Sequence, residues 1–353
     1  MTSLQKDTAM GMPVATLEDS MRFVDGVVRI LDRRIFPERI EWVEARTPAA
    51  VASAIRDMVT QSSGPYYAAA LGMELAARQA VGLDSQHTRA ALAEAGRVLA
   101  TARPTNNHPA EAVARILAAA EDASNAEDYR ARIVDASHAA ADRYRERSQA
   151  LAMHAAALIP DGARILTHCW MDTYLVELVR AGRSLDRQWE WVATETRPFL
   201  QGARLTAHTL AEMGESVTLI TDGMAAAALA PGSTLGPIDA AVTAADRVSM
   251  DGCVINKVGT LGVALAANAF GVPYYALVQS PDPEAPTATD VVIEERDPEE
   301  VFNTLGHRTA SRLLTRAWYP AFDVTPSRFV SRIVTDRGAF HPAQLADYFG
   351  GTE

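Results

Sequence analysis

The pattern of hydrophobic and polar positions changes its period near residue 160. Between Thr47 and Leu158, apolar side chains recur every three or four residues in five successive segments, which is typical of amphipathic helices. Pro48 and Pro109 stand where the first turns of two of these helices are expected, because proline is well tolerated there. The pattern therefore predicts a largely helical N-terminal domain.

A shorter alternating segment precedes these helices. Positions between Met21 and Pro37 alternate between apolar and polar, and Asp25-Gly26 is typical of the tight turn of a β-hairpin. Residues 1–18 are polar and show no periodicity, so a flexible arm is expected there. We therefore expect the N-terminal domain, a hairpin followed by helices, to span residues 19–158.

Short apolar runs alternate with helical patterns after Gly162. This alternation predicts a parallel, doubly wound (Rossmann-like) sheet domain over residues 159–353, so the expected fold class is α/β with a helical domain in front. Ligands of such sheets bind beyond the carboxyl ends of the strands. The expected strands are ARILTH (163–168), EWVAT (190–194), SVTLIT (216–221), DAAVTAAD (239–246), PYYALV (273–278) and VVIEE (291–295), and the helices between them begin near Asp172, Gln201, Met224 and Gly259.

Charge and composition exclude several classes of protein. The 353 residues suffice for two domains, and the net charge of −11 argues against a nucleic-acid partner, because phosphate contacts need clustered Lys and Arg. A small phosphorylated substrate needs only a local basic pocket. Two cysteines in so long a chain argue against a disulfide-stapled secreted protein. No signal sequence and no apolar run of about 20 residues is present, so a cytoplasmic protein without membrane association is expected.

One thiol and one carboxylate fall at expected strand ends. Cys169 lies between a strand and a helix start, which favours the thiolate, although free cysteines are more often buried structural residues. Asp246 ends another strand and is followed by Lys257 and by a helix that opens at Gly259; such a group can hold a phosphate and move a proton beside it. From the residues alone, a structural role remains open for both Cys169 and Asp246.

Several segments together resemble the signature of the methylthioribose-1-phosphate isomerases. They are ILTHC (165–169), TETRPFLQGARLTA (194–207), LITDGMA (219–225), AADRVSMDGCVINKVGT (244–260), IEERDPEEV (293–301) and PAFDVTP (320–326). The resemblance runs from about Met21 to Phe340. That family shares its fold with ribose-1,5-bisphosphate isomerases and with regulatory α, β and δ subunits of the eukaryotic translation initiation exchange factor.

The resemblance implies a role for each matching residue. Cys169 and Asp246 correspond to the family's catalytic cysteine and aspartate. Arg197 and Arg204 are either further phosphate ligands or partners in structural ion pairs. Substrate or phosphate contacts are implied for Arg103, Gln201, Asn256, Lys257 and Gly259, and further pocket positions are Gln61, Trp170, Glu195 and Asp222.

No cofactor and no metal is expected, since His168 and His307 lack partners at metal-ligand spacing. The resemblance also implies a homodimer formed through the sheet domain, and a place in methionine salvage.

Two departures from the family pattern fall at the expected site. Gln61 stands near the place of an arginine in the family's Arg-Gly-Ala stretch, and loss of such a charge-assisted contact costs about 1.5–3 kcal/mol of phosphate binding unless another group replaces it. The family follows its cysteine with asparagine, whereas this chain has Trp170-Met171-Asp172. The fold motifs are intact, so an altered substrate is the simplest explanation.

The implied reaction converts a 5-substituted ribose 1-phosphate, by default 5-methylthioribose 1-phosphate, into the ribulose 1-phosphate. Asp246 would protonate the ring oxygen, and hydrogen would then move from C2 to C1. The sequence leaves open whether it moves as a proton through Cys169 or as a hydride. The alternatives are an isomerase of ribose 1,5-bisphosphate or of a related 5-deoxy sugar phosphate, and a non-catalytic regulatory paralogue.

Overall fold

The computed structural model describes residues 15–103 and 106–350, arranged in two compact units. We call Thr16–Glu146 the helical unit and the part from Arg147 onward the sheet unit, and treat each by itself. Most of the expected flexible arm, and residues 104–105 directly after Arg103, lie outside the described residues. The domain limits at residues 18 and 158 stay a prediction.

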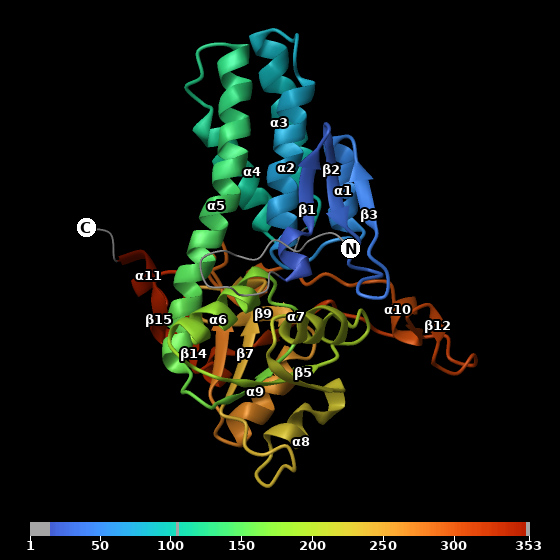
Figure 1. Cartoon of the computed structure of the whole chain (residues 1–353), viewed down its shortest axis with the longest axis vertical. Coiled ribbons are helices and arrows are strands. Elements are labelled where there is room, and N and C mark those ends of the chain that lie inside the picture. Colours follow the sequence, from blue (N-terminus) through green and yellow to red (C-terminus); the bar gives the residue numbers. More distant parts are fainter. Residues whose placement is uncertain (1–14, 104–105, 351–353) are drawn as a thin grey trace. The chain divides into compact units, whose positions relative to one another are not determined.

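The helical unit opens with a three-stranded antiparallel sheet. The hairpin is confirmed: β1 (Met21–Val24) pairs with β2 (Val27–Leu31), and Asp25 and Gly26 both have positive φ, as its two-residue turn requires. A third strand, β3 (Trp42–Ala45), was not predicted, because four residues with one glutamate among them show no clear alternation. This sheet lies against α1 and α2, as Figure 1 shows.

The five predicted helical segments are confirmed. Thr47 caps the first helix by accepting the amide of Ala50, and proline occupies the first turns of α1 and α4 as expected. Close packing depends on Gly72 and Gly96, where a Cβ would lie 2.8 Å from the side chains of Leu99 and Val113. The helices are α1 (Pro48–Arg56), α2 (Gly64–Gln79), α3 (Ser85–Ala100), α4 (His108–Ala119) and α5 (Ala126–Leu158), the last of which continues into the sheet unit.

A seven-stranded sheet forms the centre of the sheet unit and confirms the predicted α/β class. Its order is β15-β14-β10-β7-β4-β5-β6, with every pair parallel except the edge pair β14 and β15. The strands are β4 (Arg164–Thr167), β5 (Glu190–Thr194), β6 (Ser216–Ile220), β7 (Ala240–Ala244), β10 (Tyr274–Leu277), β14 (Arg332–Thr335) and β15 (Gly338–Phe340).

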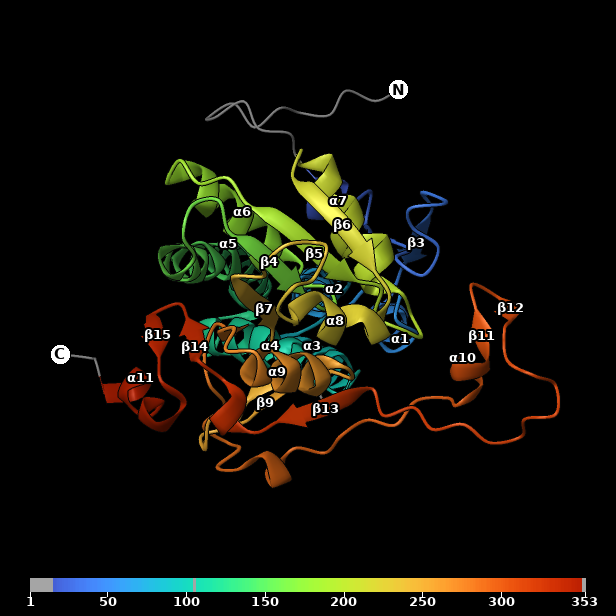
Figure 2. The same cartoon turned by 90° about the horizontal axis from the view of Figure 1, so that it is seen from below.

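Helices cover both faces of this sheet, which explains its nearly continuous hydrophobic strands. The side chains of α8 (Ala225–Leu229) and α9 (Thr260–Ala269) share one core with Leu166, Val192 and Ala241. Helix α6 (Thr173–Ser184) lies on the opposite face, as seen in Figure 2. The short π-helical turn η2 (Gly202–Thr206) leads into α7 (Ala207–Glu212). The four predicted helix starts are confirmed.

A second, antiparallel sheet in this unit carries part of the site. Strand β9 (Val254–Lys257) lies between β8 (Arg247–Val248) and β13 (Phe322–Thr325), with Asp323 directly opposite Asn256. The sequence pattern did not predict β13. Among the described residues, no helix is long and apolar enough to cross a membrane.

The expected strand VVIEE was wrong. Residues 291–295 make only an isolated bridge, from Glu295 to Pro320, and Val292 is exposed. Two adjacent glutamates and the following Arg-Asp-Pro favour solvent contact over a buried strand. The edge of the sheet is formed instead by β14 and β15. The C-terminal part also contains α10 (Glu299–Phe302), the hairpin β11 (Asn303–Thr304) and β12 (His307–Arg308), and α11 (Asp347–Gly350).

Candidate active site

The thiol and the carboxylate predicted to do the chemistry follow two adjacent parallel strands. Cys169 comes after β4 and Asp246 after β7, and β4 pairs with β7 in parallel register. The chain winds from β4 to β5 and β6 on one side, and then from β7 to β10 and β14 on the other. This reversal is the topological switch point, where doubly wound sheets bind their ligands.

The backbone of Cys169 is held in an unusual conformation. Its φ is +73°, a left-handed value that non-glycine residues rarely adopt. Its amide donates to Oγ1 of Thr196 at 2.9 Å, and its carbonyl oxygen accepts from the hydroxyl of Thr206. The thiol accepts from Nε2 of Gln201 at 3.3 Å. Strained backbone that is fixed by its surroundings is frequent at active sites.

The electrostatic surroundings of the thiol connect it to three other predicted site residues. Burial raises the pKa of Cys169 to about 11, and the Asp246 carboxylate raises it further, while Lys257 and the Gln201 hydrogen bond lower it. The thiol is therefore protonated at neutral pH. The structure thus brings Cys169, Asp246, Lys257 and Gln201 together.

Two buried side-chain atoms, on residues that contact or directly follow Cys169, have no hydrogen-bond partner among the described residues. They are Oε1 of Gln201, whose amide nitrogen holds the thiol, and Nε1 of Trp170, the residue after Cys169. Leaving a buried polar atom unpaired costs about 1–3 kcal/mol, so such atoms call for an explanation. An acceptor and a donor at this place suit a substrate that carries hydroxyl groups.

The loop between β9 and α9 carries Lys257 and Gly259. Lys257 is buried, and its Nζ lies 4.4 Å from the centre of the Phe322 ring. Asn256 is also buried, and its amide donates to Oγ1 of Thr260 at 2.9 Å. Gly259 has a φ of +108°, and its amide donates to Asp323 at 2.7 Å. The amide expected to bind phosphate is therefore occupied by a carboxylate of the chain itself.

Asp323 was not singled out from the sequence. Its carboxylate also accepts the amide of Leu261 at 3.1 Å, so it caps the first turn of α9. Burial raises its pKa to about 6, although the hydrogen bonds from Gly259 and Leu261 and the charge of Lys257 act in the opposite direction. From the sequence, its segment PAFDVTP contributed only to the family resemblance; the structure places its aspartate at the loop that carries Lys257.

His168 precedes the thiol and is buried. Its Nδ1 lies 2.6 Å from Oγ1 of Thr194, and its Nε2 lies 3.0 Å from the carbonyl oxygen of Val258. Burial lowers its pKa, against the attraction of the Asp222 carboxylate, whose nearest oxygen is 3.9 Å from Nδ1. The imidazole is therefore neutral. From the sequence, His168 was only excluded as a metal ligand and was given no other role.

The two pocket carboxylates differ in their surroundings. Asp222 accepts the backbone amides of Thr196 and Arg197 at 2.7 and 2.6 Å, so it braces the turn that follows β5. Burial raises the pKa of Glu195, and the nearby Asp222 carboxylate raises it further. Among the described residues neither side chain makes a hydrogen bond to Cys169, and of the two Asp222 lies close to His168.

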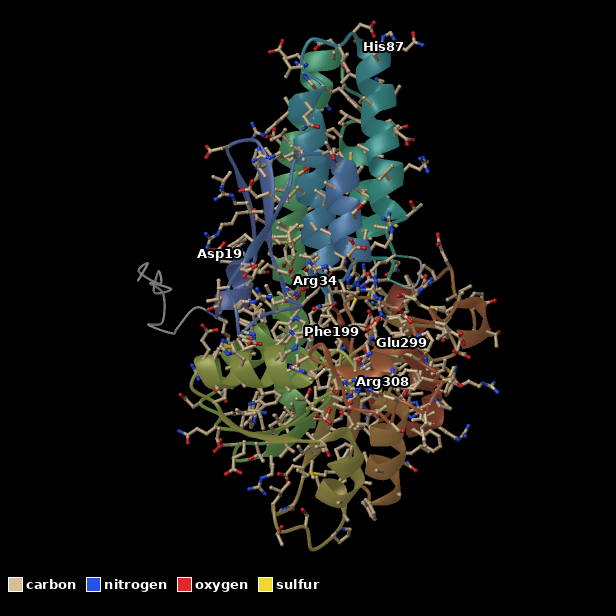
Figure 3. All side chains as sticks on the ribbon, turned by 90° about the vertical axis from the view of Figure 1, so that its right-hand side faces the viewer. Asp19, Arg34, His87, Phe199, Glu299 and Arg308 are labelled. Carbon is tan, nitrogen blue, oxygen red and sulfur yellow. The ribbon has the colours of Figure 1, made fainter. Side chains whose placement is uncertain are left out.

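The two arginines of the segment TETRPFLQGAR make structural contacts. Arg197 donates to the carbonyl oxygens of Val301 and Asn303 at 3.1 and 2.9 Å. Arg204 donates to the carbonyl of Phe199 and stacks on its ring at 4.6 Å; Figure 3 labels Phe199. These contacts favour the structural alternative for both arginines over phosphate binding.

Two predicted residues belong to the helical unit, and both are buried. Gln61 donates to the carbonyl of Met58 at 3.1 Å, and its Oε1 has no partner among the described residues. The carbonyl of Gln61 accepts from Arg33 at 3.0 Å. Arg103 is also buried in this unit. The buried guanidinium of Arg33 therefore lies directly beside Gln61, the position near which the family pattern has an arginine.

Sequence reasoning missed one more residue near the thiol. Tyr319 is buried, and its pKa is raised by burial, by Glu300 and, to a smaller extent, by Cys169. Its phenol is therefore protonated at neutral pH and within electrostatic reach of the thiol. No sequence signal marked it, because its distance from Cys169 in the chain is 150 residues and only the fold brings the two together.

The fold and the site define an α/β protein with a protonated thiol and a carboxylate at the switch point of a doubly wound sheet. The chain belongs to the initiation factor 2 subunit family, whose model matches residues 61–342.

Its relatives include the methylthioribose-1-phosphate isomerase of Chloroflexus aurantiacus, 38% identical over 90% of this chain and 94% of the relative. The isomerase of the same name from Syntrophotalea carbinolica is 36% identical, with the same two coverages of 90% and 94%.

Solved structures agree with this assignment. The 5-methylthioribose 1-phosphate isomerase of Pyrococcus horikoshii OT3 superposes with a TM-score of 0.83 at 29% identity, covering 94% of this chain and 96% of that chain. A structure titled translation initiation factor eIF-2B, subunit delta, from A. fulgidus has a TM-score of 0.77 at 31% identity, covering 92% and 96%. The resemblance to this family is confirmed.

Proposed function

We propose that the protein is an aldose–ketose isomerase that converts a 5-substituted ribose 1-phosphate, by default 5-methylthioribose 1-phosphate, into the corresponding ribulose 1-phosphate. The observation that carries this proposal is the pair formed by Cys169 and Asp246 at the ends of adjacent strands, where the Asp246 carboxylate raises the pKa of the thiol. The names of the relatives at 34–38% identity over nearly the whole chain support the same substrate and a role in methionine salvage.

The chemistry requires an acid at the ring oxygen and control of the hydrogen that moves from C2 to C1. Asp246 is the proposed acid, because ring opening with the phosphate in place needs a proton on the ring oxygen. A thiol with a pKa of about 11 is a poor base at neutral pH and a good hydrogen-bond donor. This favours a hydride shift in which Cys169 holds a substrate oxygen, over a proton shuttle through a thiolate.

The proposed substrate contacts involve the two buried polar atoms described above and the buried ammonium group of Lys257. Gln201 and Trp170 offer one acceptor and one donor to sugar hydroxyls, and Lys257 and Asn256 are the proposed phosphate ligands. Because Asp323 occupies the amide of Gly259, we assign Gly259 to shaping the loop instead of binding phosphate. Arg103 of the helical unit remains a proposed phosphate ligand.

The setting of the enzyme completes the proposal. We propose a cytoplasmic protein that works without a cofactor, binds no nucleic acid, and pairs with a second copy through the sheet unit. The net charge of −11 supports the absence of a nucleic-acid partner. Exposed apolar side chains of the sheet unit, among them Leu313 and Trp318, support the pairing.

The test is phosphorus and proton NMR of the purified protein with three substrates: 5-methylthioribose 1-phosphate, ribose 1,5-bisphosphate and 5-deoxyribose 1-phosphate. Ketose formation that is abolished by Cys169→Ala and by Asp246→Asn is the expected result. The fastest substrate identifies the group on C5. Absence of turnover with all three sugars would overturn the proposal and favour the alternative of a non-catalytic regulatory paralogue.

A further inference from the structure

The position of Lys257 relative to the thiol depends on an irregular loop. Lys257 ends β9, and Val258 and Gly259 connect it to α9. Gly259 has a φ of +108°, outside the regular regions of the backbone, so the local sequence does not determine the path of this loop. Contacts from elsewhere in the unit must hold it.

The first contact comes from His168. A carbonyl oxygen can only accept, so the bond between Nε2 and Val258 requires the proton on Nε2. Nδ1 then accepts from the hydroxyl of Thr194 at 2.6 Å. The ring also packs on Gly259, where any Cβ would lie 2.8 Å from two ring atoms. One neutral tautomer thus gives both ring nitrogens a hydrogen-bond partner. The position of the ring leaves no room for a side chain at residue 259.

The second contact comes from Asp323 on the opposite side of the loop. Pairing of β13 with β9 places Asp323 across from Asn256. From there its carboxylate accepts the amides of Gly259 and Leu261, at 2.7 and 3.1 Å. Among the charged groups of the described residues, Lys257 acts on both contact residues, and Asp222 acts on His168.

The same histidine is also joined to the turn that carries the thiol. Oγ1 of Thr194 lies 3.5 Å from Oγ1 of Thr196, which accepts the amide of Cys169. His168 therefore contacts the Lys257 loop with one nitrogen and the support of the Cys169 turn with the other. This chain of bonds and the cap from Asp323 hold the backbone of the Lys257 loop in a fixed position relative to the turn that carries Cys169.

We propose that His168 and Asp323 are positioning residues that clamp the loop 257–260 so that the ammonium group of Lys257 faces the Cys169 thiol. Neither residue touches the reacting atoms. Held in this way, the ammonium group lowers the pKa of the thiol and offsets negative charge on the substrate oxygens that the thiol meets. This inference refines the proposed isomerase site, but it concerns the thiol itself and can be tested without any substrate.

The readout is the rate at which iodoacetamide alkylates Cys169, because only the thiolate reacts and the rate reports its population. Cys253→Ser gives a parent protein whose single thiol is Cys169. In that parent, Lys257→Met sets the scale: loss of the cation is expected to slow alkylation about tenfold, the equivalent of one pKa unit. Rates are followed between about pH 7 and 9, with folding checked by circular dichroism.

Two pairs of variants separate positioning from charge. Asp323→Ala and Asp323→Asn remove the same negative charge, but only asparagine keeps an acceptor for the two amides. His168→Ala and His168→Gln are both neutral, and only glutamine keeps a donor for Val258. The clamp predicts slow alkylation in both alanine variants, approaching Lys257→Met, and recovery toward the parent rate with asparagine and glutamine. As controls, Asp84→Ala removes another helix cap and His138→Ala another paired histidine, both in the helical unit.

Equal rates in the two Asp323 variants, both faster than the parent, would show that Asp323 acts by its charge alone and would overturn the clamp. Alanine variants that stay folded and react at the parent rate would also overturn it. If the parent isomerises no sugar but the alkylation pattern is as expected, the proposed function fails while the clamp stands. If turnover is present, kcat/KM is expected to fall with the alkylation rate across the series.

Discussion

At the scale of single residues, the indole of Trp170 makes the first prediction, because its proposed role is to donate a hydrogen bond to the substrate. Its Nε1 is buried with no partner among the described residues, which costs the free protein about 1–3 kcal/mol. Trp170→Phe removes this N–H and keeps most of the apolar surface. We expect the melting temperature to rise and the KM for the sugar phosphate to increase about tenfold, because the lost donor no longer meets a substrate hydroxyl.

Trp189→Phe is the matched control, because its Nε1 donates to the carbonyl of Pro160 at 2.8 Å. Loss of that satisfied bond is expected to lower the melting temperature and leave KM unchanged. Calorimetry and steady-state kinetics of both variants check the pair. A lower melting temperature for Trp170→Phe would mean that its indole N–H is satisfied in the native protein.

The ionisation of Asp323 makes a specific prediction about stability. Its pKa in the folded protein is about 6, against an ordinary value of 3.8, so folding favours its protonated form. Its stabilising contribution is full below about pH 4 and is lost as the pH rises through 6, a change of about 3 kcal/mol. Between about pH 4 and 7, the free energy of unfolding of Asp323→Asn should therefore rise relative to that of the native protein.

Chemical denaturation across this range measures the difference between the two proteins. Asp290→Asn, which alters an exposed cap in the same unit, is the control and should show no such gain. A difference that shrinks as the pH rises would mean that the hydrogen bonds from Gly259 and Leu261 outweigh the burial of the carboxylate. Stability that is unchanged or higher, with slower turnover, would separate the role of Asp323 in the site from any role in folding.

At the scale of elements, the first residue of η2, Gly202, packs closely against Thr194 at the end of β5. A Cβ at Gly202 would overlap the carbonyl oxygen of Thr194 and lie 2.6 Å from Oγ1 of Thr196. Gly202→Ala should therefore push the turn off the strand, move Gln201 away from the thiol, and lower the free energy of unfolding by about 2–3 kcal/mol. Activity should fall with it, measured on protein that circular dichroism shows to be folded.

Gly262→Ala is the control, because a Cβ in that part of α9 meets nothing within 4 Å and glycine weakens a helix interior. That variant should gain about 0.5–1 kcal/mol. If both substitutions leave stability and activity unchanged, the turn does not need glycine at position 202.

The elements that the sequence predicted are those with a clear period. The five helices and the strands β4 to β7 and β10 follow from apolar spacing and flanking turns. Strand β13 was not predicted, because it is a four-residue strand between two prolines and contains an aspartate. The segment VVIEE has the apolar pattern of a strand but forms only an isolated bridge. The positions of Cys169 and Asp246 at strand ends were predictable from the strands themselves; their catalytic roles stay proposals.

The loop contacts of the site could not be predicted in the same way. Asp323 reaches Gly259 only because β13 and β9 pair in one particular register, and His168 reaches Val258 across 90 residues of chain. Such contacts depend on tertiary structure, and no local pattern encodes them. The resemblance to the isomerase family marked the segments that contain these residues without indicating which atoms meet.

At the scale of the whole molecule, the segment 303–318 of the sheet unit is the surface through which we expect the proposed homodimer to form. Figure 2 shows β11, β12 and the loop after them reaching away from the seven-stranded sheet, and the ion pair of Glu299 with Arg308, both labelled in Figure 3, lies near its base. Leu313 and Trp318 are 90% and 74% exposed. Large apolar side chains gathered on one exposed segment are unusual for a monomer and mark an interaction surface.

The proposed homodimer gives these side chains a partner, since in a symmetric pair the same segment of each copy is buried by the other. Leu313→Glu combined with Trp318→Glu should place charges in the interface and yield a monomer of 38.0 kDa in light scattering, where the unaltered protein gives twice that mass. Val81→Glu, at a 70% exposed apolar position of the helical unit, should leave the dimer intact. If the double variant keeps the mass of the parent, the segment serves another purpose and the pairing surface lies elsewhere on the sheet unit.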